Sequence, residues 1–232
     1  MKSFLMIGQS NMAGRGDFGE VPEIKNPNCF MLRNGRWQPM SEPINPDRAV
    51  FGTKFHSGVG LAASFADEYA KHFGENVGLI PCAEGGTYIE EWQPGEVLFE
   101  NAVNQARLAQ RSSEIVGILW HQGENDSQDE KNVKLYKERF KNLIDTLMRE
   151  LGLSESVPVI IGALGEFVGE YDGGKLRYFK EINEFLEELS SEYGAFVSAK
   201  GLTCKEDGIH FNSESYREFG KRYFAEYIKL TK

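Results

Sequence analysis

The sequence alternates short, continuous apolar runs with longer segments in which apolar residues recur every three or four positions. Continuous apolar runs of strand length are typical of parallel strands buried on both faces, and the longer spacing is typical of amphipathic helices. The runs predict strands at 4–7, 77–83, 115–120, 157–162 and 196–199. The periodic segments predict helices at 61–73, about 97–112, 132–151, about 175–191 and 213–230.

This alternation predicts one α/β domain over residues 1–232, a length that suits a single large domain with a proper core. Strands separated by helices favour a parallel sheet covered on both faces, with right-handed crossovers. We expect a three-layer α/β/α, flavodoxin-like architecture whose five strands have the order 2-1-3-4-5. That order places a topological switch point between the first and third strands, where ligands bind in such sheets.

Residues 14–60 are rich in Gly, Pro and Asn, and their prolines exclude long helices. A connection of this length usually carries function or forms a wall of the site. Residues 14–19 match the pattern GxGxxG, but Pro22 follows where a helix should run and no acidic residue ends a second strand about 20 positions later. We therefore reject a dinucleotide site, and we regard the Arg-Gly-Asp at 15–17 as chance.

The formal net charge of −9 argues against nucleic acid or an anionic membrane as the main partner and suits a neutral substrate such as a sugar. Three widely separated cysteines, Cys29, Cys82 and Cys204, suggest small buried side chains in a reducing compartment. The N-terminal apolar run is too short for a signal peptide, and no segment approaches the length of a membrane span. We expect a cytoplasmic protein. The oligomeric state cannot be read from the sequence.

Polar residues follow four of the predicted strands, and such strand ends meet at one edge of a parallel sheet. Ser10 follows the first strand and the break at Gly8, so it stands where a helix N-terminus could offer a free N–H to an anion. The residues that follow the other strands are Gly85 and Gly86, Gln122 and Glu124, and Asp207 and His210. Together they provide what acyl transfer to water requires: a nucleophile, a base with its carboxylate, and oxyanion donors.

The base can be sought by elimination, because the chain has only four histidines. His72 belongs to the outer part of a helix, and His56 has no carboxylate nearby in the sequence. His121 ends the third strand and fits packing better than catalysis. His210 follows Asp207 by three residues in a loop, so the carboxylate can meet its ring. Each of these residues also has an ordinary structural explanation, such as a helix cap for Ser10, and only their combination indicates a site.

Three motifs together resemble the SGNH hydrolases: Gly8-Gln9-Ser10-Asn11-Met12, Trp120-His121-Gln122-Gly123-Glu124 and Asp207-Gly208-Ile209-His210-Phe211. Within that superfamily the chain is similar to the branch of family-six carbohydrate esterases (acetylxylan esterases) and sialate O-acetylesterases. Gly85-Gly86-Thr87, with Glu91-Trp92 shortly after, also resembles this branch. The matches run in the expected order across almost the whole chain.

The resemblance implies a serine esterase that removes acetyl groups from a small acetylated sugar, without cofactor or metal. It assigns the nucleophile to Ser10, the general base to His210 and its orienting partner to Asp207. The oxyanion hole would use the N–H groups of Ser10 and Gly86 and the side chain of Gln122, although most SGNH enzymes have Asn there. Glu124 would be an additional site acid, and whether it or Asp207 is the main partner of His210 stays open.

The substrate is less well defined. The chain departs from the branch at residues 57–60, where we expect a proline between glycines, and at bulky Tyr88, where a small residue is usual. We expect the substrate pocket to draw on Gln9, Asn11, Thr87, Tyr88, Trp92 and His121. The acetylated sugar could be a xylo-oligosaccharide or resemble sialic acid. Two alternatives are an SGNH thioesterase or lysophospholipase acting on another acyl ester, and a non-catalytic sugar-binding domain of the same fold.

Overall fold

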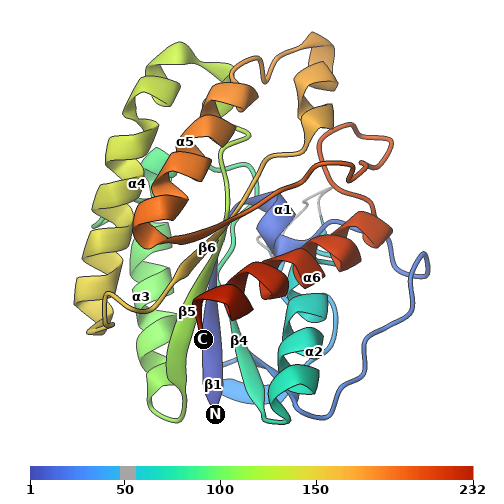
Figure 1. The fold of residues 1–232 in the computed structure, drawn as a ribbon, viewed down its shortest axis with the longest axis vertical. Helices are drawn as coiled ribbons and strands as arrows, with labels where there is room; N and C mark the ends of the chain where they lie inside the picture. Colours follow the sequence, from blue (N-terminus) through green and yellow to red (C-terminus); the bar gives the residue numbers. More distant parts are fainter. Residues whose placement is uncertain (48–55, 232) are drawn as a thin grey trace.

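The computed structural model describes residues 1–47 and 56–231. Its centre is a mostly parallel sheet of seven strands in the order β3-β2-β4-β1-β5-β6-β7, with helices on both faces (Figure 1). The strands are β1 (Lys2–Gly8), β2 (Cys29–Arg33), β3 (Arg36–Pro39), β4 (Val77–Pro81), β5 (Glu114–His121), β6 (Val159–Gly162) and β7 (Gly194–Val197).

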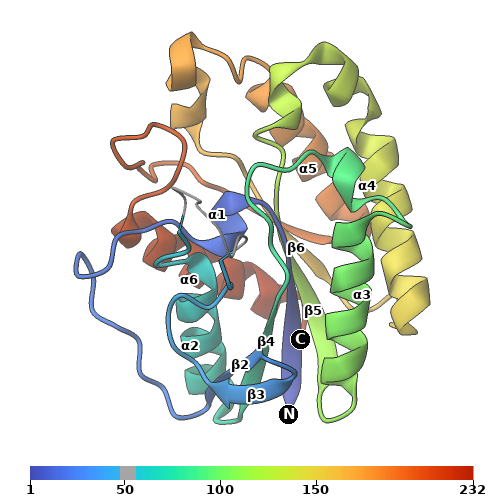
Figure 2. The same ribbon diagram turned by 180° about the vertical axis from the view of Figure 1, so that it is seen from behind.

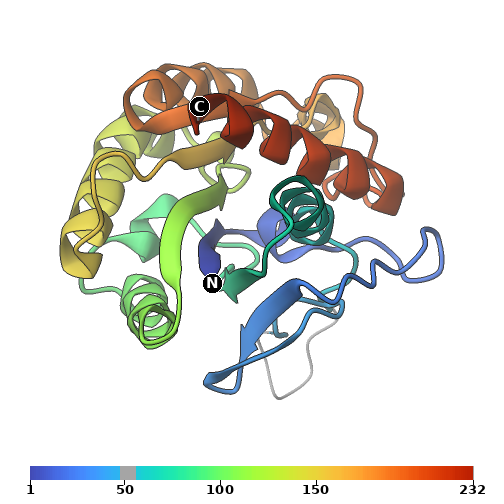
Figure 3. The same cartoon turned by 60° about the horizontal axis from the view of Figure 1, so that its bottom comes forward.

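The longer helices form the two outer layers. They are α2 (Leu61–Phe73), α3 (Val97–Gln110), α4 (Glu130–Leu151), α5 (Phe179–Tyr193) and α6 (Ser213–Leu230). Helices α3, α4 and α5 cover one face of the sheet, and α2 and α6 cover the other, as the view in Figure 3 shows. Four short helices lie between them: α1 (Ser10–Ala13), η1 (Ile89–Trp92), η2 (Asp126–Gln128) and η3 (Glu166–Gly173).

The alternation of side chains along β1 explains the two layers. Leu5 and Ile7 belong to the core beneath α3, α4 and α5, whereas Phe4 and Met6 belong to the core beneath α2 and α6. Successive side chains of a strand point to opposite faces, so a strand between two helical layers is apolar throughout. All four side chains are at most 1% exposed, which is why this run is continuous in the sequence.

The prediction of a five-stranded parallel sheet of order 2-1-3-4-5 is wrong, because the sheet has seven strands and one is antiparallel. The five predicted segments occupy β4, β1, β5, β6 and β7, and the 14–60 segment adds β2 and β3 beyond β4. These two strands are joined by Asn34 and Gly35, both at positive φ, the geometry of a tight hairpin turn (Figure 2). They are short and lie among prolines, and β2 joins the rest of the sheet only through distant β4, so local pattern does not reveal them.

The helices agree more closely with the sequence pattern. Helices α2 and α6 have the predicted bounds, and the other three shift by two to four residues at one or both ends. Gly74 and Gly152 end α2 and α4 in the left-handed conformation, as glycine commonly does after a helix. Within the described part of the chain, no helix is long and apolar enough to cross a membrane.

Strand β1 lies at the centre of the sheet, paired with β4 on one side and β5 on the other. Gly8 ends it with a φ of 131°, and a Cβ there would lie 2.1 Å from the carbonyl oxygen of His121. Only glycine therefore fits between β1 and β5 at this point. The chain then turns directly into α1, which brings Ser10 to the carboxyl edge of the sheet.

Candidate active site

Ser10, His210 and Asp207 form one hydrogen-bonded chain, although the serine and the histidine are 200 residues apart in the sequence. His210 Nε2 lies 2.9 Å from Ser10 Oγ, and His210 Nδ1 lies 2.8 Å from Asp207 Oδ2. When Nδ1 donates its proton to the carboxylate, Nε2 is left as an acceptor for the serine hydroxyl. The arrangement can therefore deprotonate Ser10 as it attacks a carbonyl carbon.

The loop that carries the histidine is held by its own backbone. Asp207 Oδ1 accepts hydrogen bonds from the N–H groups of Ile209 and His210, both at 3.0 Å, and Gly208 turns the chain at a φ of 71°. Lys205 N–H donates to the carbonyl oxygen of His210 at 2.8 Å. These bonds fix the carboxylate and the imidazole relative to each other before α6 begins at Ser213.

Asp207 stays ionised at neutral pH. Burial raises the pKa of its carboxyl, but hydrogen bonds from the His210 side chain and from the N–H groups of His210 and Ile209 together lower the pKa well below its usual range. The stabilisation these bonds give is present above the ordinary pKa of an aspartate and is lost only as the pH falls below it. A charged partner for the imidazolium of His210 is thus available at neutral pH.

Ser10 opens into a cavity of about 420 Å³ that collects residues from the loops after β1, β4 and β5, from η3 and from the loop before α6. Ser10 and His210 are only 6% and 8% exposed, so both side chains lie at the bottom of a recess. The lining consists of Gln9, Ser10, Arg15, Glu84, Gly85, Gly86, Asn125, Tyr171, Asp207, Ile209 and His210.

Two backbone N–H groups can serve a developing oxyanion. Ser10 and Gly86 both line the cavity, and neither N–H donates to an acceptor among the described residues. Gly86 has a φ of 73°, a left-handed conformation that glycine adopts without strain. Fixed donors of this kind stabilise a negative oxygen in a recess from which most water is excluded.

The structure does not bring Gln122 to the cavity, so the sequence interpretation of this residue as an oxyanion donor is corrected. Its side chain is fully buried, and Nε2 donates to the carbonyl oxygen of Thr87 at 3.0 Å and to Asp126 Oδ2 at 2.6 Å. Both hydrogens of the amide are thereby used. Gln122 instead links the loop after β5, to which it belongs, to the loop after β4 through its hydrogen bond to Thr87.

Glu124 is also displaced from its expected role, because it does not contact His210. Its Oε1 accepts from Asn11 Nδ2 at 2.6 Å and lies 3.6 Å from His121 Nδ1, and the side chain is fully buried. Burial lowers the pKa of His121, although Glu124 opposes this shift, and the ring contacts the carbonyl oxygen of Ala163 at 3.1 Å. Asp207 is therefore the carboxylate that serves His210.

Of the six residues expected in the substrate pocket, only Gln9 lines the cavity. Asn11 is buried behind it, where its amide bonds Glu124 and the carbonyl oxygen of Ile209. Thr87, Trp92 and His121 are also buried, with at most 1% exposure, and Tyr88 lies outside the cavity at the start of η1. The buried side chains among them hold the site loops together and do not line the cavity.

The sequence interpretation missed several lining residues, among them Arg15, Asn125 and Tyr171. Arg15 lies in the rejected GxGxxG segment, its Nη1 bonding Gly14 O at 2.8 Å and Ser57 Oγ at 3.3 Å. Burial lowers the pKa of its guanidinium, and Tyr216, Asp47 and Glu84 oppose the shift. Asn125 directly follows the recognised motif and could have been included with it. Tyr171 has no local signal, because η3 reaches the cavity only through the fold.

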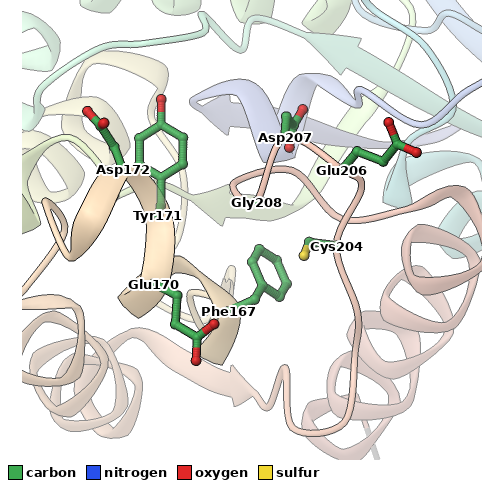
Figure 4. Close-up of a pocket in the computed structure, with 8 residues that line it drawn as sticks. All are labelled: Phe167, Glu170, Tyr171, Asp172, Cys204, Glu206, Asp207 and Gly208. Atoms are coloured by element: carbon green, nitrogen blue, oxygen red, sulfur yellow. The ribbon is translucent and has the colours of Figure 1, made fainter.

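A second cleft of about 590 Å³ shares Tyr171 and Asp207 with the catalytic cavity. Figure 4 shows Phe167 and Tyr171 on η3, opposite the loop at 204–208. Four carboxylates line the same cleft, those of Glu170, Asp172, Glu206 and Asp207. Aromatic faces and hydrogen-bond acceptors of this kind suit a polyhydroxylated ligand. In the described residues, no group of three or more His, Cys, Asp or Glu side chains is arranged to hold a metal ion.

Comparisons with known proteins show the family of this chain. Residues 1–229 match the family model described as carbohydrate esterase, sialic acid-specific acetylesterase. A protein of Arabidopsis thaliana described as a probable carbohydrate esterase is 31% identical over 244 residues, which cover 97% of this chain and 89% of that protein.

Solved structures show the same fold. An Arabidopsis thaliana protein aligns with a TM-score of 0.84 at 29% identity, covering 98% of each chain. NanS aligns with a TM-score of 0.77 at 16% identity, covering 99% of this chain and 97% of NanS. A carbohydrate acetylesterase from Xanthomonas citri aligns with a TM-score of 0.65 at 20% identity, covering 96% of this chain and 54% of that one.

Proposed function

Because the chain belongs to the family of sialic acid-specific acetylesterases among the carbohydrate esterases, and is thus a carboxylic ester hydrolase, we propose that it removes O-acetyl groups from a sugar through an acetyl-enzyme on Ser10. One observation carries this proposal. Ser10 Oγ, His210 and Asp207 are joined by hydrogen bonds of 2.9 and 2.8 Å at the bottom of a cavity. This is the geometry that an activated serine nucleophile needs.

In the first half of the reaction, Ser10 Oγ attacks the acetyl carbonyl carbon while its proton passes to His210 Nε2. The carbonyl oxygen becomes negative and accepts hydrogen bonds from the N–H groups of Ser10 and Gly86. The tetrahedral intermediate then expels the sugar oxygen, which takes the proton from His210. The products of this step are the free sugar hydroxyl and an acetyl ester on Ser10.

In the second half, a water molecule takes the place of the sugar. His210 removes a proton from the water as its oxygen attacks the acetyl carbon, and the same oxyanion donors stabilise the second intermediate. Collapse of that intermediate breaks the bond to Ser10 Oγ, which recovers its proton from His210. Acetic acid leaves, and Asp207 stabilises the imidazolium in both halves.

The family and the relatives' descriptions support a carbohydrate as the alcohol part of the ester, either a xylo-oligosaccharide or a sialic acid-like sugar. The cleft beside the cavity gives room for such a group next to the acetyl ester. Acetate release should be measured over a panel of acetylated sugars of both kinds, with Ser10→Ala as the blank. Release by the native protein that is lost in Ser10→Ala supports the proposal, whereas equal release by both would contradict it.

An acyl-length series distinguishes this function from that of a thioesterase or lysophospholipase. The native protein should hydrolyse acetyl esters faster than esters of longer acyl chains. A rate that rises with chain length would favour the alternative. A catalytic Ser10 should also become labelled by an organophosphonate serine probe, which a sugar-binding domain without catalysis would leave unreacted.

A further inference from the structure

The side-chain amide of Asn11, one residue after Ser10, is buried behind the catalytic cavity. Its Nδ2 donates to the carbonyl oxygen of Ile209 at 3.1 Å, and its Oδ1 accepts from the N–H of Phe211 at 3.2 Å. A carbonyl oxygen only accepts and a peptide N–H only donates, so these two contacts determine which end of the amide is the nitrogen. Ile209 and Phe211 are the neighbours of His210 in the chain. One side chain of α1 therefore holds the backbone on both sides of the base.

Two buried side chains fix the orientation of this amide. Glu124 Oε1 accepts from Asn11 Nδ2 at 2.6 Å, and the hydroxyl of Tyr216 donates to Asn11 Oδ1 at 2.6 Å. The amide thus makes four hydrogen bonds, the full number that an asparagine side chain can form. Glu124 and Tyr216 are both fully buried, and a polar group left without a partner in such a place is costly. The amide is therefore held in one orientation before any substrate binds.

The base and its carboxylate form a unit that is separate from α1. Asp207 bonds the ring of His210 and the N–H groups of residues 209 and 210, so this pair is held together within its own loop. Among the described residues, the hydrogen bonds that join α1 to this loop are those of Ser10 and Asn11. The bond between Ser10 and His210 is the one whose geometry catalysis requires, so Asn11 is the contact that can maintain it.

Other bonds keep the loop folded without Asn11. Lys205 Nζ donates to the carbonyl oxygen of Arg15 at 2.9 Å, and Ser213 Oγ donates to that of Asp17 at 2.9 Å. Both acceptors lie beyond the end of α1, so these bonds hold the loop on the molecule without joining it to the helix that carries the nucleophile. Removal of the Asn11 amide should therefore displace the base from Ser10 rather than unfold the loop.

We propose that Asn11 is a positioning residue that sets the place of His210 relative to Ser10, and that Glu124 and Tyr216 orient its amide for this purpose. The inference rests on the proposed function, because it concerns the proton transfer between Ser10 and His210 in that reaction. It gives a role to a buried amide that does not line the cavity. It also gives a role to Glu124, which bonds Asn11 and does not contact His210.

Asn11→Ala tests the assignment on a small chromogenic acetate ester. Displacement of a catalytic group by about 1 Å can lower a rate about a hundredfold, so we expect kcat to fall by about that factor, with KM changed less than about threefold. The matched control is Asn183→Ala. The amide of Asn183, on α5 and outside the cavity, also bonds a backbone N–H and C=O, those of Leu164 at 2.7 and 3.0 Å. The control should keep the native kcat, and a native kcat in Asn11→Ala would overturn the proposal.

A double-mutant comparison separates a positioning residue from one that only stabilises the fold. His210→Ala should keep a residual rate from the rest of the site. In that background Asn11→Ala should lower kcat less than about twofold, because no base is left to position. A further loss of about a hundredfold there would show that Asn11 acts on Ser10 or on the fold, and would contradict the proposal.

A second variant covers the case in which Asn11→Ala does not fold because Glu124 is left buried without its donor. Asn11→Ala combined with Glu124→Gln removes the buried carboxyl, and a neutral amide is less costly to bury than a carboxylate. The kcat of this double variant should lie about a hundredfold below that of Glu124→Gln alone. Equal rates in these two proteins would overturn the proposal.

Labelling of Ser10 by an organophosphonate separates this inference from the proposed function, because labelling needs the base but no sugar. Asn11→Ala should be labelled more slowly than the native protein, by about the same factor as its loss in kcat. A native protein that is labelled but releases no acetate from any sugar would contradict sugar deacetylation, while the labelling rates would still decide the role of Asn11. A native protein that the phosphonate does not label would contradict both.

Discussion

At the scale of single residues, the site depends on which hydrogen-bond donors are already used. Gln122 stands in the motif that suggests an oxyanion donor, yet both its amide hydrogens go to Thr87 O and Asp126. Glu124 follows in the same motif, yet it bonds Asn11 rather than His210. A motif therefore indicates which residues gather at a site, whereas the role of each depends on its partners.

The role of the two carboxylates can be tested directly. Asp207→Asn should lower kcat roughly a thousandfold, because the amide cannot stabilise the imidazolium and favours the wrong tautomer of His210. Glu124→Gln should keep kcat within about tenfold, since a glutamine oxygen can still accept from Asn11 Nδ2. Both are measured as ester hydrolysis with the melting temperature as a check of folding. A larger loss in Glu124→Gln with an intact fold would assign the catalytic role to Glu124.

The buried carboxyl of Asp126 should make the free energy of unfolding depend on pH. Burial raises the pKa of its carboxyl to about 6, against an ordinary 3.8, although hydrogen bonds from Gln122 and Ile89 N–H oppose the shift. Asp126 therefore binds its proton more tightly in the folded protein than in the unfolded chain. Its contribution to the free energy of unfolding is full below about pH 4 and is lost as the pH rises through 6.

Asp126→Asn should remove that dependence. Between pH 4 and pH 7, the unfolding free energy of the native protein should fall by about 3 kcal/mol more than that of the variant, as measured by urea denaturation at each pH. If the unfolding free energies of the native protein and the variant changed with pH in parallel, the pKa of Asp126 would be the same in the folded and unfolded states, which would contradict the prediction.

At the scale of elements, the contact between the ends of β1 and β5 determines where the nucleophile stands. Gly8 and His121 are paired across these strands, and the carbonyl oxygen of His121 occupies the space that a Cβ of residue 8 would need. Such close packing transmits any displacement of β1 to Ser10, two residues later. The close approach of the β5 backbone therefore explains why the motif begins with glycine.

Gly8→Ala should cost about 3 kcal/mol or more of unfolding free energy, because the overlap with His121 adds to the unfavourable φ. The matched control is Gly95→Ala, since Gly95 also has a positive φ, 92°, but no neighbouring atom lies within 4 Å of where a Cβ of residue 95 would stand. That control should lose only about 1–2 kcal/mol. Urea denaturation measures both, and equal losses would show that φ alone, not the contact with β5, requires glycine at position 8.

At the scale of the whole molecule, the site is an assembly of distant segments. The segments after β1, β4 and β5 supply Ser10, Gly86 and Asn125 to the cavity, and the loop before α6 supplies Asp207 and His210. Helix η3 adds Tyr171, which also lines the neighbouring cleft. The two recesses thus form one continuous surface on which an acetylated residue and an adjoining sugar could both lie.

Tyr171→Ala should lower kcat/KM for an acetylated oligosaccharide about tenfold, the effect of losing roughly 1.4 kcal/mol of contact with an aromatic ring. For a small chromogenic acetate ester the change should stay below about threefold, because no sugar reaches the cleft. Tyr88→Ala, outside both recesses, is the control and should change neither value. Equal losses on both substrates would place the effect of Tyr171 at the acetyl group instead.

The sequence by itself determined the helices, the five buried strands and the three residues that form the hydrogen-bonded chain. The helices and strands follow from local pattern, because a strand between two helical layers is apolar throughout, and a histidine three residues after an aspartate can meet it within one loop. Ser10 follows from its place after the first predicted strand and from the resemblance of its motif. The tertiary structure alone decided the hairpin of β2 and β3, the reassignment of Gln122 and Glu124, and the presence of Asn125 and Tyr171 in the cavity. Each of these depends on a partner far away in the chain, and no local pattern specifies which hydrogen-bond partner a polar side chain finds.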